Sequence, residues 1–457
     1  MKANKNSDRL GKEPITRLLL RLSIPAMIGM AIQALYNVVD SIYIGHLSKE
    51  ALSAISLVFP IQIILIAISV GTGIGTSSYI SRLLGKDEED KAQNVANHVF
   101  VIVIIYSILI GLFGYLYADK LLHFFTDVPE LISLGTRYIR IILIGSVALF
   151  FPIITNNIIR GQGNTLIPTI GLAIGAITNI ILDPFLIFGI WIFPKLGIEG
   201  AAVATIFARF LSGIFLSFFL FKERLNIKIN IKKIRFDPKI IYKIYQVGFP
   251  AMLMQILGSI RVTGVNKIVA SYNVLALAVV GIFFKLQSFI LMPIFGLNHG
   301  YIPIIGYNYG RDNKTRIKKT IQCGMFIAFG ITFLGFLLFT IFPKQLILLF
   351  NDNPELVKIG TNALRKIGPS YLFIGLAIVA SSTFQAFGNG LPSLIVSFLR
   401  QIIILLPSMY ILGKVFGLSA TWVSFPLSEF IGTVVIFLWL FLFLKKKKII
   451  STSSEKV

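Results

Sequence analysis

The chain has 457 residues, of which 55% are hydrophobic and only 14% are charged, and its mean hydropathy is +0.82. A soluble globular protein would be roughly one quarter charged, so this composition excludes an ordinary soluble domain. The net charge of +23 at pH 7 fits a nucleic-acid-binding protein in magnitude, but the placement of the basic residues, described below, excludes that class.

Apolar stretches long enough to cross a hydrocarbon core about 30 Å thick recur along the whole chain. Because helices satisfy their own backbone hydrogen bonds in lipid, these stretches predict an all-α membrane protein. Twelve transmembrane helices are expected, at 15–44, 52–84, 94–117, 131–159, 167–190, 197–222, 240–269, 275–309, 318–342, 356–387, 392–413 and 418–444.

Basic residues gather in alternate loops, such as Arg82–Lys91 and Arg311–Lys319, and in both terminal segments. By the positive-inside rule, this asymmetry predicts a multi-pass protein of the cell (inner or plasma) membrane with both termini in the cytoplasm. The expected domains are an N-terminal lobe at 1–222, a basic cytoplasmic linker at 223–239, and a C-terminal lobe at 240–457 that ends in a basic cytoplasmic tail.

The two halves of the sequence repeat each other at a shift of 225 residues. Gln62 then meets Gln287, "IPAM" meets "FPAM", "GKD" meets "GRD", and "DVPEL" meets "DNPEL". Six spans are an even number, so both halves begin on the same side of the membrane. We therefore expect two pseudo-symmetric six-helix bundles related by an axis along the membrane normal, which is the layout of an alternating-access transporter.

The acids inside the spans break this repetition. Asp40 faces Val265 at the 225-residue shift, and Asp183 has no acidic counterpart. Asn179 lies one turn before Asp183, and Tyr36 lies one turn before Asp40, so each pair can share a helix face. Ionisable residues inside a membrane are functional by default, which makes this polar pocket a predicted cation-coupling site.

The coupling ion stays open between H⁺ and Na⁺. Burial favours the neutral form of a carboxyl group, and a second carboxyl nearby strengthens that preference, so the pocket could take up a proton. Na⁺ is a hard cation that prefers oxygen ligands, and Asp40, Asn179 and Asp183 could supply them. A structural role, with each acid paired to an arginine or a backbone amide, is the alternative.

Charged residues in the second half have less certain roles. Toward the end of each half the register of the repeat slips to a shift of 220 residues, and there Glu429 occupies the repeat position of Arg209. An ion pair that holds the two bundles together is the simplest interpretation. Arg261, Lys267 and Lys285 place positive charge on the second bundle and are expected to be structural or to extend toward the membrane surface.

Soft and aromatic side chains are abundant, with 39 Phe and 8 Met in the chain. Such adaptable walls suit varied hydrophobic cations. Apolar and polar side chains on or near the spans are predicted to line a central substrate cavity, and the set is Met27, Met30, Gln33, Asn37, Phe59, Phe151, Met252, Gln255, Phe283 and Phe284.

Several segments resemble the multidrug and toxic compound extrusion (MATE) family. They are "IPAMIGMAIQALYNVVDSIYIGHL", "GTGIGTSSYISRLLGKDEEDKA", "IIRGQGNTLIP", "NIILDPFLIFGI" and "GIFFKLQSFILMPIFGLNHGYIPIIGYNYG", and the resemblance covers nearly the whole chain. It implies twelve helices in two lobes and drug efflux driven by inward movement of H⁺ or Na⁺.

Within that family the chain looks like the DinF-like branch, in which a polar network in the N-terminal lobe carries coupling. The resemblance maps Asp40, Asn179 and Asp183 to this network and adds Thr205. Other branches place an acid in the first or second span of the C-terminal lobe, where this chain carries Gln255, Arg261, Lys267 and Lys285 instead.

The sequence therefore predicts a monomeric secondary antiporter that exports organic cations and other drugs, with no cofactor and no enzymatic activity. A flippase for lipids or lipid-linked oligosaccharides of the same superfamily is the alternative. An enzyme would need a nucleophile–base set or a metal cluster, and the four histidines are scattered while Cys323 is the only cysteine. A passive channel would have no use for a pair of ion-binding carboxyl groups.

Overall fold

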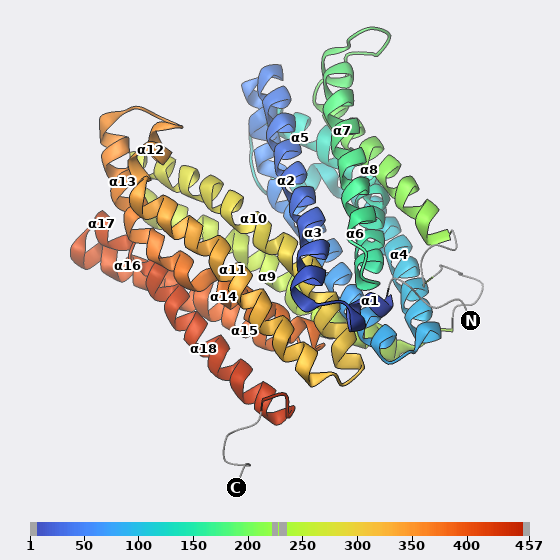
Figure 1. Cartoon of the computed structure of the whole chain (residues 1–457). Coiled ribbons are helices and arrows are strands. Elements are labelled where there is room, and N and C mark those ends of the chain that lie inside the picture. The colour runs from blue at the N-terminus through green and yellow to red at the C-terminus, as the bar shows by residue number, and fades with distance from the viewer. Residues whose placement is uncertain (1–6, 222–226, 228–234, 451–457) are drawn as a thin grey trace.

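A computed structural model describes residues 7–221, 227 and 235–450, and Figure 1 shows these residues as two splayed bundles of helices. No strand occurs in the described residues. Eleven continuous helical stretches of the described residues, together with one pair of helices bent by 49°, are long and apolar enough to cross a membrane. They give twelve spans when the bent pair counts as one. The all-α fold and the twelve predicted spans are thus confirmed.

The first bundle, the N lobe, holds the helices from α1 to α8. Their bounds are α1 Ser7–Lys12, α2 Ile15–Leu47, α3 Lys49–Gly85, α4 Glu89–His123, α5 Pro129–Ile144, α6 Ser146–Gly161, α7 Leu166–Phe188 and α8 Ile198–Phe221. The predicted linker falls mainly on residues 222–226 and 228–234, which lie outside the described part of the chain.

The second bundle, the C lobe, holds the helices from α9 to α18. Their bounds are α9 Pro238–Ala270, α10 Val274–Gly310, α11 Lys314–Ile341, α12 Pro343–Leu348, α13 Pro354–Ile367, the 3₁₀ turn η2 Gly368–Ser370, α14 Tyr371–Ala386, α15 Leu391–Phe398, the π-helical turn η3 Leu399–Ile404, α16 Leu405–Phe416, α17 Leu418–Thr421 and α18 Ser424–Lys446.

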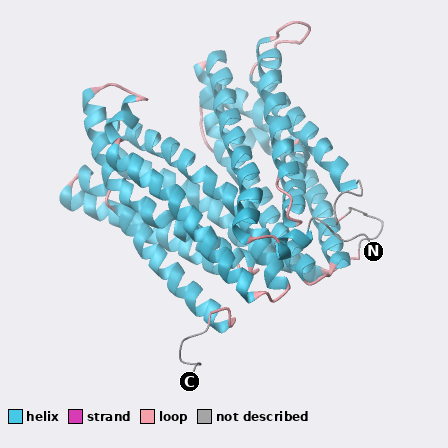
Figure 2. Cartoon of the chain, viewed as in Figure 1, coloured by secondary structure: helices cyan, strands magenta, loops and turns pink. Residues whose placement is uncertain are grey.

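Local sequence explains where the C-lobe helices begin. Asp237, Asn273, Asn313 and Asn353 precede α9, α10, α11 and α13, and each side chain accepts a hydrogen bond from a backbone N–H of the first turn. Such caps satisfy donors that a helix start leaves unpaired. Loops consequently gather at the two ends of the bundles, while helices fill the space between (Figure 2).

The internal repeat is visible in the backbone. Helices α2 and α9 have 33 residues each, and α3 and α10 have 37 each. Gly163 and Gly388, which correspond at the 225-residue shift, both have a left-handed backbone, with φ of 79° and 86°. A residue with a side chain is strained there, so the repeat preserves glycine at this turn.

The lobes meet through crossed helix pairs, since α2 packs against α10 and α3 packs against α9. Glycines permit this close approach. A methyl group added to Gly75 would overlap the carbonyl of Ile244. One added to Gly300 would lie only 2.9 Å from the side chains of Leu22 and Ser23, which is too close. Small residues at such crossings let helix backbones come together in a membrane.

Polar contacts join the lobes at the end of the molecule where the described chain begins and ends (Figure 1). Ser78 donates a hydrogen bond to the carbonyl of Gln385 at 2.5 Å, and Arg82 donates one to the carbonyl of Ala386 at 3.2 Å. The Nη1 atom of Arg160 lies 3.2 Å from the ring nitrogens of His299. The bundles diverge toward the opposite end, so the molecule is joined at one end only.

Candidate functional site

Three helices of the N lobe bring the predicted coupling residues together. Asp40 lies on α2, Asn179 and Asp183 lie on α7, and Thr205 lies on α8, and α7 packs against both other helices. Asn179 and Asp183 are four residues apart and therefore share one face of α7. The four-residue set that the sequence predicted is thus a single cluster in space.

Hydrogen bonds order this cluster around Asn179. Its Nδ2 donates to Asp183 Oδ1 at 3.0 Å and lies 3.4 Å from the hydroxyl oxygen of Thr205. Asp183 is fully buried, Asn179 is 1% exposed and Thr205 is 6% exposed. The site is therefore shielded from solvent on the α7 and α8 side.

The carboxyl groups of Asp40 and Asp183 lie within hydrogen-bonding contact of each other. One buried oxygen on each of Asp40, Asp183 and Asn179 has no hydrogen-bond partner in the described residues. Buried polar atoms are almost always paired, so three unpaired oxygens in one cluster require an explanation. A proton or a cation shared among them would provide it.

Three further residues border the cluster. Arg209 lies one turn after Thr205 on α8 and attracts the carboxylate of Asp40 electrostatically. Tyr138 on α5 feels the charge of Asp40, and its hydroxyl accepts a hydrogen bond from Gln62 Nε2 on α3 at 3.1 Å. Arg209 and Tyr138 are not among the residues that the sequence predicts for the site, although a basic residue within a span is itself a signal of a polar partner.

Tyr36, the fifth predicted coupling residue, lies one turn before Asp40 on α2 and is partly exposed. It acts electrostatically on Tyr138. It therefore borders the polar cluster rather than forming its buried centre.

The predicted substrate residues separate into two groups. Met30 and Gln33 are partly exposed, and Asn37, Phe59 and Gln255 are exposed. They lie on α2, α3 and α9, three of the four helices that form the crossed pairs between the lobes. Their exposure is compatible with the predicted substrate wall.

The remaining members pack against protein, which differs from the prediction. Phe283 is fully buried in the C lobe, where its ring packs edge to face against Phe339 and Phe425. Phe151 packs against Phe100 within the N lobe. Phe283 is a core residue and Phe151 is partly buried against the N-lobe core. A hydrophobic run does not reveal which side chains face the interior of their own bundle.

Met27 and Met252 lie in the joined part of the lobe interface. A side chain on Gly296 would overlap Met27, and one on Gly71 would overlap Met252. Phe284 is partly buried, and the guanidinium of Arg261 lies over its ring at 5.5 Å from the centroid. These three residues therefore contact protein in the present conformation.

The C lobe has a polar cluster of its own. Arg400 Nη1 donates to Glu429 Oε2 at 2.5 Å, and Arg261 Nη2 donates to Gln287 Oε1 at 3.2 Å. Arg400 belongs to η3 and Glu429 to α18, so this ion pair lies within one lobe. The interpretation that an ion pair of Glu429 holds the two bundles together is therefore wrong.

The repeat relates the two clusters. Gln287 and Glu429 of the C lobe correspond to Gln62 and Arg209 of the N lobe. The N-lobe cluster combines two acids with one arginine, whereas the C-lobe cluster combines two arginines with one acid. The two lobes thus carry polar clusters of opposite charge balance.

No group of three or more histidine, cysteine or acidic residues suited to a metal ion occurs in residues 7–221, 227 and 235–450. The predicted Na⁺ ligands Asp40, Asn179 and Asp183 supply only two acidic side chains and one amide.

Both lobes of this chain match known proteins. The family model MatE matches residues 25–185 and 250–411, one stretch in each lobe. The multidrug export protein MepA of Staphylococcus haemolyticus is 29% identical over 432 residues, which cover 94% of this chain and 93% of that protein.

Solved structures of transporters have the same fold as this chain. An outward-facing multidrug resistance MATE family transporter of the MOP superfamily matches with a TM-score of 0.92 and 27% identity, over 98% of this chain and 100% of that chain. A MOP superfamily transporter from Pyrococcus furiosus matches with a TM-score of 0.91, 27% identity and the same coverage. The chain therefore belongs to the MatE family, whose members are transporters and not enzymes.

Proposed function

We propose that this transporter exports hydrophobic, often cationic drugs in exchange for H⁺ or Na⁺ that binds at Asp40 and Asp183. The observation that carries the proposal is the contact of two carboxyl groups in the N lobe, each with one buried oxygen that has no hydrogen-bond partner among the described residues. The name of the related MepA protein, a multidrug export protein, supports the class of substrate.

The chemistry of the pair supports coupling. Two ionised carboxylates have no proton to share and repel each other, so their contact requires a proton or a cation between them. The amide of Asn179 donates to Asp183 and keeps its own oxygen free as a third acceptor. The site thus gains one positive charge when occupied and loses it when empty.

The proposed cycle uses this change of charge. From the end at which the lobes diverge, an ion binds at Asp40 and Asp183 and weakens the hold on a cationic drug. The drug leaves, the lobes rock, and the ion is released at the other end. Coupling requires that the ion and the drug favour different states of the protein.

We further propose that the chain is a DinF-like member with both termini in the cytoplasm of a plasma-membrane location. The acid pair in the N lobe supports the branch, and so does the absence of acids in the first two C-lobe spans, where Arg261, Lys267 and Lys285 occur. The basic loops on the side of the termini support the orientation. In this orientation the present conformation opens outward.

A flippase for lipids or lipid-linked oligosaccharides is the second candidate. The excess positive charge of Arg261 and Arg400 over Glu429 in the C lobe would suit an anionic headgroup. The export proposal stands ahead of it because the acid pair has no role in passive movement of a lipid.

The test is uptake of a fluorescent cation such as ethidium into proteoliposomes under a pH gradient or a Na⁺ gradient, each imposed alone. We expect one of the two gradients to drive ethidium transport by the wild-type protein. The same gradient should drive no transport by the Asp40→Asn variant. Asp119→Asn, an exposed acid at the end of α4, serves as the control and retains transport. Full gradient-driven transport by Asp40→Asn would disprove the coupling site, and lipid scrambling without ethidium transport would favour the flippase.

A further inference from the structure

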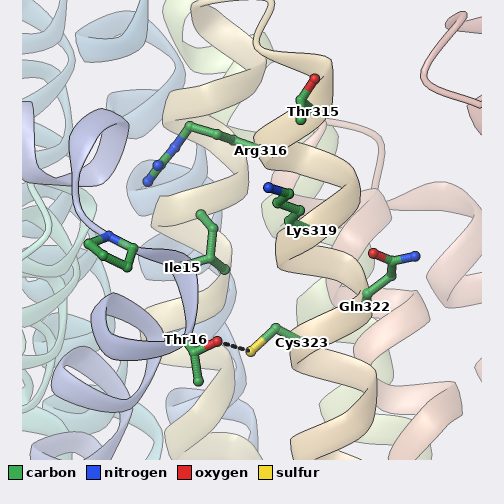
Figure 3. Close-up of a pocket in the computed structure, with 8 residues that line it drawn as sticks. Ile15, Thr16, Thr315, Arg316, Lys319, Gln322 and Cys323 are labelled. Atoms are coloured by element: carbon green, nitrogen blue, oxygen red, sulfur yellow. Dashed lines mark hydrogen bonds between the residues drawn. The ribbon is translucent and has the colours of Figure 1, made fainter.

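A pocket of about 420 Å³ lies at the seam between the two lobes, at the end where they are joined (Figure 3). Its walls come from the start of α2 in the N lobe and the first turns of α11 in the C lobe. The lining residues are Pro14, Ile15, Thr16, Thr315, Arg316, Lys319, Gln322 and Cys323. This volume is in the range of small-ligand sites.

The lining is basic and lacks an acid. Among the described residues, the ammonium group of Lys319 has neither an ion pair nor a hydrogen bond, and the side chain is exposed. Glu13, the acid that precedes the lining residue Pro14 in the sequence, already pairs with Arg21 at 3.1 Å and Arg9 at 3.8 Å. The pocket therefore presents uncompensated positive charge beside the hydroxyl groups of Thr16 and Thr315.

Arg316 gives the pocket its rigid wall. Its Nη2 donates to the carbonyl oxygens of Leu10 at 3.1 Å and Glu13 at 2.8 Å, and its Nε donates to Asn308 Oδ1 at 3.1 Å. These bonds tie α11 to α1, to Glu13 just before α2, and to α10. The charge of Arg316 is thus held in place whether or not a ligand is present.

Exposed apolar side chains lie beside the pocket, on the same two helices. Helical spacing places Phe326 one turn beyond Gln322 on α11, and Leu20 one turn beyond Thr16 on α2. Phe326 is 80% exposed and Leu20 is 38% exposed. A basic pocket that continues into an exposed apolar strip matches the headgroup and acyl chains of a phospholipid.

We propose that this pocket binds the phosphate headgroup of an anionic phospholipid, with Lys319 as its counter-charge, and that the bound lipid holds α2 and α11 together. Basic pockets between transmembrane helices recognise such headgroups. Because α2 and α11 belong to different lobes, the lipid stabilises the conformation in which this end is closed. Lipid composition would then set how readily the lobes separate.

Cys323 provides the measurement, because it lines the pocket and is the only cysteine of the chain. The full-length protein is placed in phosphatidylcholine nanodiscs that contain increasing fractions of phosphatidylglycerol, and the rate of Cys323 alkylation by an uncharged maleimide is followed. We expect phosphatidylglycerol to slow alkylation in a saturable way.

Two neighbouring lysines provide the matched comparison. Lys319→Gln is expected to raise the half-saturating fraction of phosphatidylglycerol about fivefold, the effect of one basic residue near a lipid headgroup. Lys318→Gln removes the same charge one residue away, at a position that does not line the pocket, and is expected to leave the fraction unchanged. A general effect of surface charge would act alike in both variants, and that result would overturn the proposal.

A soluble phosphate compound could bind the pocket in place of the phosphate headgroup of a lipid. In pure phosphatidylcholine nanodiscs, inorganic phosphate and glycerol phosphate are expected not to slow alkylation. If either protects Cys323 as well as phosphatidylglycerol does, the site takes a soluble phosphate and the lipid proposal fails. No protection by any of the three would likewise overturn it.

Discussion

At the scale of single residues, Asn179 holds the coupling cluster together. It donates to Asp183 at 3.0 Å and approaches Thr205 at 3.4 Å, so the first bond is the better one. Asp183 is fully buried, and the loss of the Asn179 amide would remove a donor from its Oδ1 atom. Thr205, by contrast, contributes a long contact at the edge of the cluster.

This difference predicts a ranking of two variants. Asn179→Leu should cost about 1–3 kcal/mol at the site, the penalty for an unpaired buried polar group, and should reduce ion-driven transport strongly. Thr205→Val keeps the shape of the side chain and should have a small effect. Initial rates in proteoliposomes against the concentration of the driving ion provide the measurement. Equal losses in the two variants would contradict this role of Asn179.

Single residues also show which parts of the site the sequence can predict. Asp40 and Asp183 were identified because a charged residue within a span is costly and because the other half of the repeat lacks them. Tyr138 and Arg209 were not assigned to the site, since nothing in a sequence states which helices are neighbours. Phe283 was wrongly placed in the cavity for the same reason.

At the scale of elements, the structure contains helix breaks that the expected spans do not include. The expected spans 131–159 and 356–387 are each interrupted, by Gly145 between α5 and α6 and by η2 between α13 and α14. Pro369 lies within η2 and lacks a backbone donor, which favours an interruption there. The π-helical turn η3 has no counterpart in α7, the matching helix of the N lobe.

The π-helical turn carries Arg400, and its ion pair with Glu429 gives a stability prediction. The side chains of Arg400 and Glu429 are 13% and 7% exposed, so Glu429→Gln leaves a buried guanidinium without its partner. Removing one partner of a buried pair costs about 3–5 kcal/mol, and a large fall in thermal midpoint is expected. The double variant with Arg400→Gln should recover part of that loss.

An exposed ion pair serves as the control for this measurement. Arg137 lies 3.8 Å from Glu199, with side chains 54% and 33% exposed. Arg137→Gln should change stability by about 1 kcal/mol or less. If Glu429→Gln changed the thermal midpoint no more than Arg137→Gln, the C-lobe pair would have no structural role.

At the scale of the whole molecule, the lobes are joined at one end and separate at the other, as Figure 1 shows. Alternation between two such states requires the joined end to open. Thr16 on α2 and Cys323 on α11 lie on opposite sides of this joint, and the thiol donates to the Thr16 hydroxyl at 3.6 Å. A bond between these positions would prevent the opening.

This contact predicts a reversible lock. Thr16→Cys places a second thiol beside the only native cysteine, and oxidation should join α2 to α11 and abolish transport in proteoliposomes. Reduction should restore it. Ser53→Cys, on α3 near Ser48 and the opposite end of the molecule, should be insensitive to oxidation. Undiminished transport by the oxidised Thr16→Cys protein would show that α2 and α11 need not separate.

The sequence by itself determined the membrane location, the twelve spans, the two-fold repeat and the asymmetric pair of acids. These features follow from hydropathy, helix length and charge, which each segment carries independently of its neighbours. The tertiary structure alone decided which polar groups meet, because Asp40, Asp183, Gln62 and Tyr138 lie on four different helices, α2, α7, α3 and α5. It also decided that Glu429 pairs with Arg400 and that the lobes join at one end, since both depend on how helices pack.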